Sequence, residues 1–201
     1  MSLGHALRRI IREYPLARLD PLPGHPLAHV IRRGAPDEVR AALPAGAPGL
    51  LVKGSPGRGL HWAAVPWIAV FDPAVTTSAT QGFYLVYLFP ADREAVHLSL
   101  AQGTVAAIRA HGMRAEAALR ADGPRLRARL SDFAERLPAT AIGLGAAGEL
   151  PRGYEAAHIL GVTYALAALD DERRLRRDLA TGLDAYRALK ARGGLAGLHP
   201  P

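Results

Sequence analysis

The sequence predicts an α+β protein in which N-terminal and C-terminal helices pack against a compact mixed β-sheet spanning roughly residues 50–101. Three short apolar runs predict the strands: Trp67–Phe71, Phe83–Phe89 and Val96–Leu100, each bounded by Pro, Asp, Gly or polar residues. The segments on either side have the spacing of amphipathic helices. With 201 residues and 49% hydrophobic content, the chain can form one proper core.

The N-terminal part contains two predicted helices and one short strand. The first helix covers residues 3–14, and its apolar side carries Leu3, Leu7, Ile10, Ile11 and Tyr14. A second helix is expected near residues 36–43, where Pro44 ends it. Leu50–Lys53 is a candidate strand that leads into the sheet region.

The residues after the sheet are predicted to be mostly helical. One helix is expected over residues 105–119, imperfect near Gly112. A second begins at Asp122, which is followed by Gly-Pro, and a third covers Tyr154–Leu169. The last helix starts at Asp170, because acidic residues in a first turn suit the helix dipole.

The composition favours a cytoplasmic protein with a single domain over residues 1–192 and a flexible tail or linker over residues 193–201. The chain contains no cysteine, which excludes disulfides and thiol catalysis and fits a reducing compartment. No apolar run is long enough to span a bilayer, and the N-terminus lacks a signal-peptide core. We therefore expect no membrane partner.

The charge of the chain points to nucleic acid. The net charge is +7, and of the 25 basic residues only Lys53 and Lys190 are lysine. Arginine binds phosphate through two hydrogen bonds and stacks on bases, so this bias suits DNA or RNA. A GC-rich genome would produce the same excess of arginine without a functional reason.

No motif makes a positive case for catalysis. Residues 143–148 read GLGAAG, but Pro151 follows too soon for the helix of a dinucleotide site, so a loop is favoured. Residues 54–59 (GSPGRG) lack the ending of a P-loop, although such a loop could still approach a phosphate. No catalytic or metal-binding set stands out, so we expect a binding module without a cofactor. A nucleotide-binding enzyme that uses the GLGAAG loop stays an alternative, which a parallel β-α-β unit there would support.

Several side chains of the sheet region suit a binding role. Asp72 ends the strand Trp67–Phe71 and could accept a hydrogen bond from a cytosine amino group, although a turn residue is favoured. The polar loop of residues 76–82 could contact phosphate or a base edge, or simply connect two strands. Tyr84 and Tyr87 are three apart on one strand and point to opposite faces, so at most one lines a given pocket.

The strand at residues 96–100 alternates clearly. Val96, Leu98 and Leu100 face one way, whereas His97 and Ser99 face a wet or site-facing side. A lone histidine such as His158 is more often a packed or surface residue than a ligand.

Four ordered segments carry a resemblance that covers about residues 5–190. They read GSPGRGLHWAAVPWIAVFD, TTSATQGFYLVYLF, HLSLAQGT and LPRGYEAAHILGVTY, and a charged terminal helix follows. This pattern resembles the McrB-like N-terminal domain family. The positions that carry the pattern are Ser55, Gly57, Gly59, Trp62, Pro66, Trp67, Asp72, Thr76, Thr77, Ser78, Gly82, Tyr84, Tyr87, Leu88, Phe89, Gln102, Gly103, Gly153, Tyr154, Glu155 and His158.

The resemblance implies a DNA-recognition module of a modification-dependent (type IV) restriction system, which serves phage defence. Such a module directs a nuclease to modified double-stranded DNA. The expected partner is an AAA+ GTPase or nuclease domain or subunit. Because this sequence has no Walker motif or nuclease signature, that partner is expected on another chain or in another part of a longer protein.

A modified base, such as methylated or hydroxymethylated cytosine, would be read in a groove or after flipping into a pocket with an aromatic wall and a polar edge. Trp62, Trp67 or one of the two tyrosines would supply the wall, and Arg58 would help to hold the backbone. The candidate DNA-binding residues are Lys53, Ser55, Arg58, Trp62, Trp67, Asp72, Thr76, Thr77, Ser78, Gln81, Tyr84, Tyr87, Gln102, Tyr154 and His158. Two alternatives are a reader of a backbone modification such as phosphorothioate, and a non-catalytic interaction subunit that docks through Arg173–Arg177.

Overall fold

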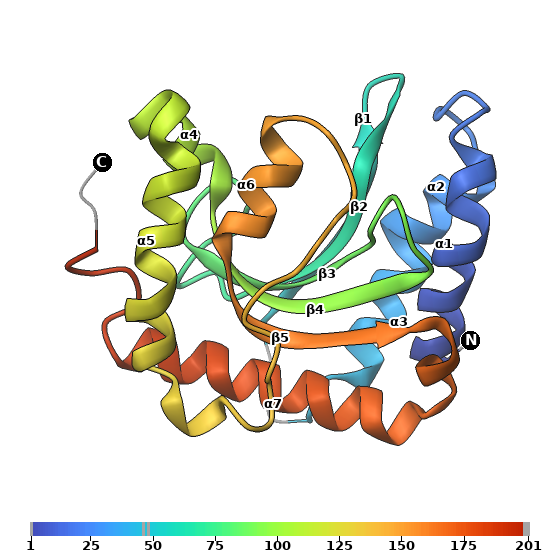
Figure 1. The fold of residues 1–201 in the computed structure, drawn as a ribbon. Coiled ribbons are helices and arrows are strands. Elements are labelled where there is room, and N and C mark those ends of the chain that lie inside the picture. The colour runs from blue at the N-terminus through green and yellow to red at the C-terminus, as the bar shows by residue number, and fades with distance from the viewer. Residues whose placement is uncertain (1, 46, 48, 199–201) are drawn as a thin grey trace.

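A strongly curved five-stranded sheet forms the centre of the protein, with helices on both of its faces (Figure 1). The computed structural model describes residues 2–45, 47 and 49–198. The strands follow the order of the chain: β1 (Leu51–Arg58), β2 (His61–Phe71), β3 (Phe83–Leu88), β4 (Ala95–Gln102) and β5 (His158–Ala165). The α+β class is confirmed. All neighbouring strands are antiparallel, so the expectation of a mixed sheet is wrong.

The fifth strand corrects the helix predicted over Tyr154–Leu169. The helix α6 (Glu149–Ala157) ends before it, and the chain then continues as β5. A short apolar run such as HILGVTYA fits either a strand or a helix by its pattern alone. The free edge of β4 decides the outcome, because Val162 pairs with Leu98 and Leu160 with Leu100. The sheet therefore extends beyond residues 50–101.

The predicted terminal helices are confirmed. They are α1 (Leu3–Ala17) and α7 (Glu172–Ala191). Besides these two and α6, the helical elements of the described residues are α2 (Pro26–His29), η1 (Val30–Gly34), α3 (Ala35–Ala42), α4 (Thr104–His111), η2 (Gly112–Arg114), α5 (Ala115–Ala128), η3 (Ser131–Phe133) and η4 (Leu166–Asp170). The Asp171 side chain caps α7 by accepting a hydrogen bond from the Arg174 amide. The helix start predicted at Asp122 is wrong: α5 continues through Pro124, and the break lies at Gly112, whose φ is +54°.

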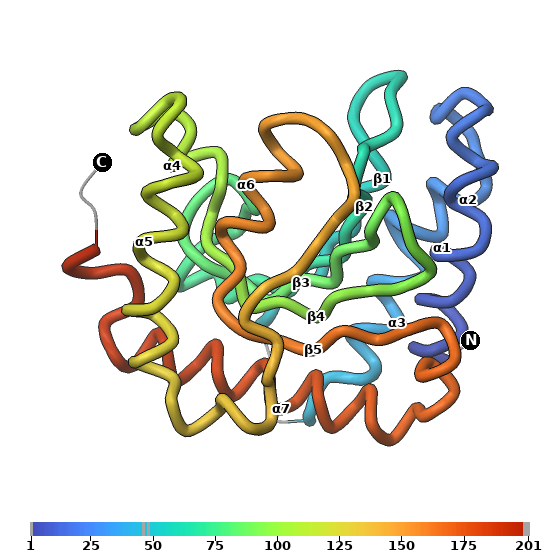
Figure 2. The backbone as a smooth tube through the Cα atoms, in the orientation of Figure 1, coloured from blue at the N-terminus to red at the C-terminus, as the bar shows by residue number. Residues whose placement is uncertain are grey.

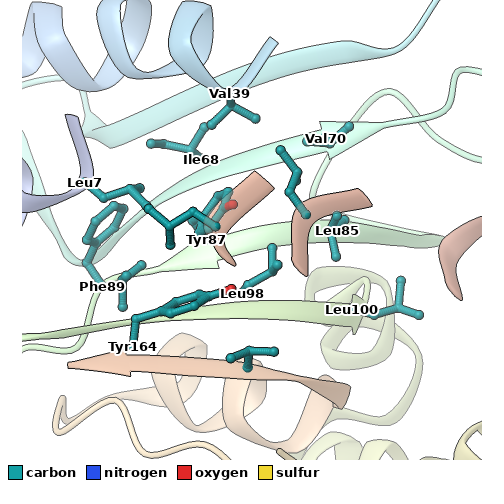
Figure 3. Packing of buried hydrophobic residues seen from close by; sticks show 14 of the residues in the cluster. Leu7, Val39, Ile68, Val70, Leu85, Tyr87, Phe89, Leu98, Leu100 and Tyr164 are labelled. Atoms are coloured by element: carbon teal, nitrogen blue, oxygen red, sulfur yellow. The ribbon is translucent and has the colours of Figure 1, made fainter. Parts of the chain in front are cut away.

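Each face of the sheet has its own apolar cluster. The larger cluster joins α1, α3 and α7 to the sheet, and Figure 3 shows Leu7, Val39, Tyr87 and Tyr164 within it. The smaller cluster, on the other face, includes Phe71, Tyr84, Val86 and Leu88 from the strands and Leu144 from the segment 138–148. The strand at residues 67–71 supplies side chains to both clusters, as its continuous apolar run predicts.

The segment 138–148 covers the face of β4 that was expected to be wet or to line a site. Figure 2 shows this backbone crossing the sheet on its way to α6. His97 Nε2 lies 3.0 Å from the carbonyl oxygen of Gly143, and His158 Nε2 lies 2.9 Å from that of Ala139. Ser99 Oγ lies 2.7 Å from His158 Nδ1. His97 and Ser99 are therefore buried, and the imidazole rings of His97 and His158 hold the segment on the sheet.

Two further expectations concern the ends of the chain and the membrane. Within the described residues, no helix is long and apolar enough to cross a bilayer. Residues 193–198 form turns, and the guanidinium of Arg129 donates to the carbonyl oxygens of Gly194 and Ala196. The rest of the predicted tail, residues 199–201, lies outside the described residues.

Candidate nucleic-acid interface

An open groove of about 330 Å³ lies between the β1–β2 hairpin and the start of α6. Trp62 and Trp67 line its strand side, Leu150 and Tyr154 line its helix side, and Arg58 stands on the hairpin. On β1 the groove is also lined by Ser55 and Gly57. The remaining lining residues are His61, Ala63, Ala64 and Val65 of β2 and Pro151 of α6. The groove thus combines aromatic surfaces with a cation at its edge.

A small pocket in the curved sheet adjoins this groove. Trp67 and Tyr154 line both, so the two spaces meet at these rings. The other lining residues are Ala79, Tyr84, Val86, Leu88, Ala101, Gln102 and Ala157. The two-residue repeat of β3 places its three side chains on this one face. The pocket has a volume of about 10 Å³ and an uncharged lining, which is room for about one water molecule.

The polar groups of the pocket are two hydroxyls and one amide. The Tyr84 hydroxyl donates to the carbonyl oxygen of Ala79 over 3.0 Å. The Gln102 amide donates from Nε2 to the Leu119 carbonyl oxygen over 3.3 Å, and Oε1 stays an acceptor. No hydrogen bond from the described part of the chain engages the Tyr154 hydroxyl, whose pKa burial raises above the ordinary 10.0. These groups can read the edge of a neutral ligand.

The polar loop of residues 76–82 forms one wall of the pocket through Ala79. Its conformation is held from within, because Thr76 Oγ1 accepts from the Ser78 amide and donates to the Ser78 carbonyl oxygen. The loop is also fastened to the end of β4: the Gly103 amide donates to the Gly82 carbonyl oxygen over 2.7 Å. A Cβ atom at Gly103 would lie 2.3 Å from the Cα atom of Gln81, so only glycine permits this approach.

The β1–β2 hairpin is braced from behind by α1. The Tyr14 hydroxyl lies 2.9 Å from the Pro56 carbonyl oxygen and 2.7 Å from that of Ala63. The Trp62 indole packs edge-on against the Tyr14 ring, with centroids 5.3 Å apart, and donates to the Asp20 carbonyl oxygen. Gly57 sits at a bulge with a φ of +143°, where a side chain would collide with the opposite strand. Trp62 therefore positions the hairpin as well as lining the groove.

The exposed apolar side chains gather along one edge of the molecule. In Figure 1 the upper edge holds the C-terminal end of α1, the tip of the β1–β2 hairpin, the start of α6 and the junction of α4 with α5. The large exposed hydrophobic residues of the described chain lie in these segments or, for Leu19, in the turn directly after α1: Leu16, Leu19, Leu60, Met113 and Leu150. Leu60, at the hairpin tip, is 72% exposed and stands two residues from Arg58. Apolar tips beside arginine are typical of proteins that insert a wedge into DNA.

The structure brings about half of the predicted site residues into the groove and pocket. Ser55, Arg58, Trp62, Trp67 and Tyr154 line the groove, and Tyr84 and Gln102 line the pocket. Thr76, Thr77, Ser78 and Gln81 belong to the loop that walls the pocket, although Ala79 is the loop residue that faces it.

Four predicted residues lie elsewhere. Lys53 donates to the Thr77 carbonyl oxygen and lies over the Phe71 ring. Tyr87 packs in the cluster on the opposite face, as the spacing of the two tyrosines predicts. His158 is buried beneath the segment 138–148.

Asp72 is the fourth, and it is a turn residue. Its Oδ1 accepts from the Ala74 amide, and its Oδ2 pairs with Lys190 Nζ at 2.6 Å. Burial disfavours ionisation of this carboxyl, but the hydrogen bonds from Lys190 and Ala74 outweigh that effect and lower its pKa. A carboxylate that is paired with Lys190 in this way is not placed to accept a hydrogen bond from a DNA base.

Sequence reasoning missed the apolar members of the site. The groove residue Leu150 was not predicted, and neither were the pocket-lining residues Ala79 and Ala101. Leu60, which is exposed at the hairpin tip and lines neither space, was not predicted either. Leu60 did leave a signal, because a large apolar residue between Gly59 and His61 stands in a turn that offers it no core. The two alanines leave no signal in a single sequence, since their small size matters only opposite the aromatic rings.

Residues 9–191 match the model of a protein family that is described as "MrcB-like, N-terminal domain". The chain belongs to this family. No curated protein matches the chain. Membership links this McrB-like domain to modification-dependent restriction.

Proposed function

We propose that this McrB-like domain recognises modified double-stranded DNA and thereby directs a partner that holds the AAA+ GTPase or nuclease activity. The modification is a small group on a base, such as a methyl or hydroxymethyl group on cytosine, and the base is flipped out of the duplex. The observation that carries the proposal is the aromatic groove that leads into an uncharged pocket. The chain itself has no catalytic role in this proposal, and it acts in the cytoplasm.

Trp67 and Tyr154 supply the aromatic surfaces for the flipped base. Both are half-buried and both line the groove and the pocket, so a base that moves inward passes between them. Aromatic walls and a few polar groups are what a flipped base needs. Gln102 also lines the pocket, and its carboxamide can pair with the hydrogen-bonding edge of a neutral base.

The pocket must widen to hold a base, because its volume is only about 10 Å³. The loop of residues 76–82 is the wall best suited to move. Two hydrogen bonds fasten its centre: the Tyr84 hydroxyl donates to the Ala79 carbonyl oxygen, and the Ala106 amide of α4 donates to the Thr80 carbonyl oxygen over 2.7 Å. Displacing each such bond costs about 1 kcal/mol. Stacking of the incoming base, worth about 1–3 kcal/mol, offsets that cost.

The hairpin tip provides the contacts that open the duplex. Leu60 is exposed at the tip and can occupy the space that the flipped base leaves. Arg58, which has no ion pair within the described residues, can hold the adjoining phosphate. The brace formed by Tyr14 and Trp62 keeps the tip rigid while it inserts.

The arginine cluster at Arg173–Arg177 gives less support to a docking role. Arg174 and Arg177 pair with Asp178, and Arg176 pairs with Glu172, on the same helix. Arg174 also lies over the Tyr164 ring. These contacts partly balance the charge of the cluster on its own helix, so we favour DNA recognition over a pure interaction subunit.

The proposal is tested by competition binding at near-physiological salt. One duplex is compared in unmodified form and with 5-methylcytosine, 5-hydroxymethylcytosine, N6-methyladenine or phosphorothioate. We expect at least tenfold tighter binding, about 1.4 kcal/mol, for a modified base. Trp67→Ala and Tyr154→Ala should abolish that preference, whereas Tyr87→Phe, on the opposite face, should keep it.

Other outcomes lead to other conclusions. Equal and salt-sensitive binding to all duplexes would reduce the function to backbone affinity. A preference for phosphorothioate alone would mean that the protein recognises a modification of the DNA backbone and not a flipped base. No binding at all would refute DNA recognition by this chain and favour the interaction subunit.

A further inference from the structure

We propose that the DNA duplex runs along the whole upper edge of the molecule in Figure 1, and that two flank sites hold it on opposite sides of the hairpin tip. One flank site is Arg18 at the end of α1, and the other is Arg109 with Arg114 at the junction of α4 and α5. The inference rests on the proposed function, because the flanks belong to the duplex that carries the modified base. It adds contacts outside the groove and the pocket.

Three tips of this edge repeat one combination of side chains. Each carries an exposed arginine within two residues of a large exposed apolar residue. The pairs are Arg18 with Leu19 directly after α1, Arg58 with Leu60 on the hairpin, and Arg114 with Met113 at the α4–α5 junction. DNA is a matching partner, because its phosphates attract arginine while apolar side chains enter its grooves. A single exposed apolar residue needs no explanation, so it is the repetition along one edge that calls for a partner.

The arginines of the flank sites are free to bind phosphate. The guanidinium groups of Arg18, Arg109 and Arg114 form no hydrogen bond or ion pair within the part of the chain that the structure describes. At the start of α6, by contrast, Arg152 lies 3.6 Å from Glu116. An arginine without a carboxylate partner loses no ion pair when it binds a phosphate, which favours these three over Arg152.

Two arginines flank the sharp turn at the α4–α5 junction. Gly112, with a φ of +54°, ends α4 and turns the chain between Arg109 and Arg114. Arg114 is the N-cap residue of α5, where a cation opposes the helix dipole. No Asp or Glu occurs between Thr104 and Ala115 to balance these charges. The helix gains nothing from Arg114, so a partner outside the chain is the better reason for it.

Both flank sites are fixed relative to the groove. The Arg18 amide donates to the Tyr14 carbonyl oxygen over 3.2 Å, and the Tyr14 hydroxyl braces the hairpin. On the other side, α4 packs closely against α6, since a Cβ atom on Gly153 would lie 2.2 Å from Thr104 Cγ2. The groove and the two flank sites therefore form one surface with a set spacing.

Figure 1 shows the two flank sites on opposite sides of the groove. The α4–α5 junction lies beyond α6, and the end of α1 lies beyond the β1–β2 hairpin. The groove itself lies between the hairpin and α6. A duplex whose modified base enters the groove therefore extends one flank toward each site. Because the modified strand fixes the direction of the duplex, each site serves one flank only.

The experiment measures how salt changes the DNA affinity of wild type, Arg18→Ala and the double variant Arg109→Ala/Arg114→Ala. The probe is a duplex with one modified base on one strand, either 5-hydroxymethylcytosine or the base that wild type prefers in the competition experiment. It is used with both flanks long, and with the 5′ or the 3′ flank shortened to a few base pairs. On the long duplex, Arg18→Ala should reduce the slope of log K against log salt by about 0.9, and the double variant by about 1.8.

The shortened duplexes separate the two flank sites. Each variant should lose its effect when one flank is shortened, and the two variants should respond to opposite flanks. Arg173→Ala, on α7 at the lower edge of Figure 1, is the matched control and should behave as wild type on all three duplexes. All four substituted positions are exposed, and thermal melting verifies that the variants stay folded.

An unchanged salt slope in either variant would overturn the inference, while a preference of wild type for the modified duplex would keep the proposed function. Equal losses on all three duplexes would also overturn it, because they would show an effect of net charge and not of a flank contact. If wild type prefers no modified duplex but both variants lose slope as expected, the proposed function fails and the edge remains a DNA-binding surface. No binding of any duplex by wild type would refute both.

Discussion

The buried histidine His158 makes the stability of this domain sensitive to mild acid. It is 2% exposed, and its two ring nitrogens are engaged by Ser99 Oγ and by the Ala139 carbonyl oxygen. A carbonyl oxygen only accepts, so Nε2 carries the proton and Nδ1 accepts from the serine hydroxyl. Burial lowers the pKa of His158 from 6.5 to about 4, and the hydrogen bond to Ala139 counteracts only part of that shift.

The direction of the pH effect follows from proton uptake. Between pH 6.5 and about 4 the unfolded chain binds a proton at this histidine that the folded protein does not bind. The free energy of unfolding therefore falls as the pH is lowered through that window. A pKa difference of this size corresponds to about 3 kcal/mol in total, of which about 2 kcal/mol is lost by about pH 5. Burial also lowers the pKa of His97, which adds a loss of the same sign.

Urea denaturation of wild type and His158→Asn at a series of pH values between 7 and 4 measures this contribution. The variant should be less stable at pH 7, since it loses a buried contact, but its stability should decline less as the pH falls. The difference between the two curves isolates the histidine from the carboxylates, which titrate in both proteins. If the two curves run parallel from pH 7 to pH 4, the reasoning is refuted.

Three substitutions around the site make further predictions. Tyr84→Phe removes the hydrogen bond to the Ala79 carbonyl oxygen and should lower the free energy of unfolding by about 1 kcal/mol in urea titrations. Gly103→Ala places a Cβ atom 2.3 Å from the Cα atom of Gln81, and it should cost about 1–3 kcal/mol by the same measurement. Arg58→Ala should weaken binding to modified and unmodified duplexes equally, and it should reduce the slope of log K against log salt by about 0.9.

Each of these three predictions has a control. Tyr87→Phe matches Tyr84→Phe, because the Tyr87 hydroxyl is buried and has no hydrogen-bond partner among the described residues, and it should cost little. Gly59→Ala, at a glycine with open space around it but a φ of +61°, separates backbone strain from the collision at Gly103. Arg173→Ala, on α7, should leave the salt slope unchanged. Equal losses in variant and control would contradict the corresponding reasoning.

The local pattern of the sequence was sufficient for the elements whose neighbours are close in the chain. The stripe of apolar residues in α1 predicts which side chains face the core, and the two-residue period of β3 predicts which side chains share a face, because the periods of helix and strand are properties of the backbone itself. For the same reason, the separation of Tyr84 and Tyr87 onto opposite faces could be stated in advance. The long ordered motifs indicated the family, which the match over residues 9–191 confirms.

Only the tertiary structure decided the features that depend on partners distant in the chain. The apolar run at residues 158–165 became a strand because β4 offered a free edge. His97 and Ser99 became buried because the segment 138–148 crosses them. The pocket exists because β3 and the end of β4 meet Tyr154 of α6 and the small side chain of Ala79. A single sequence records periodicity and size at each position, but not which distant surfaces meet, and a binding site is made by such meetings.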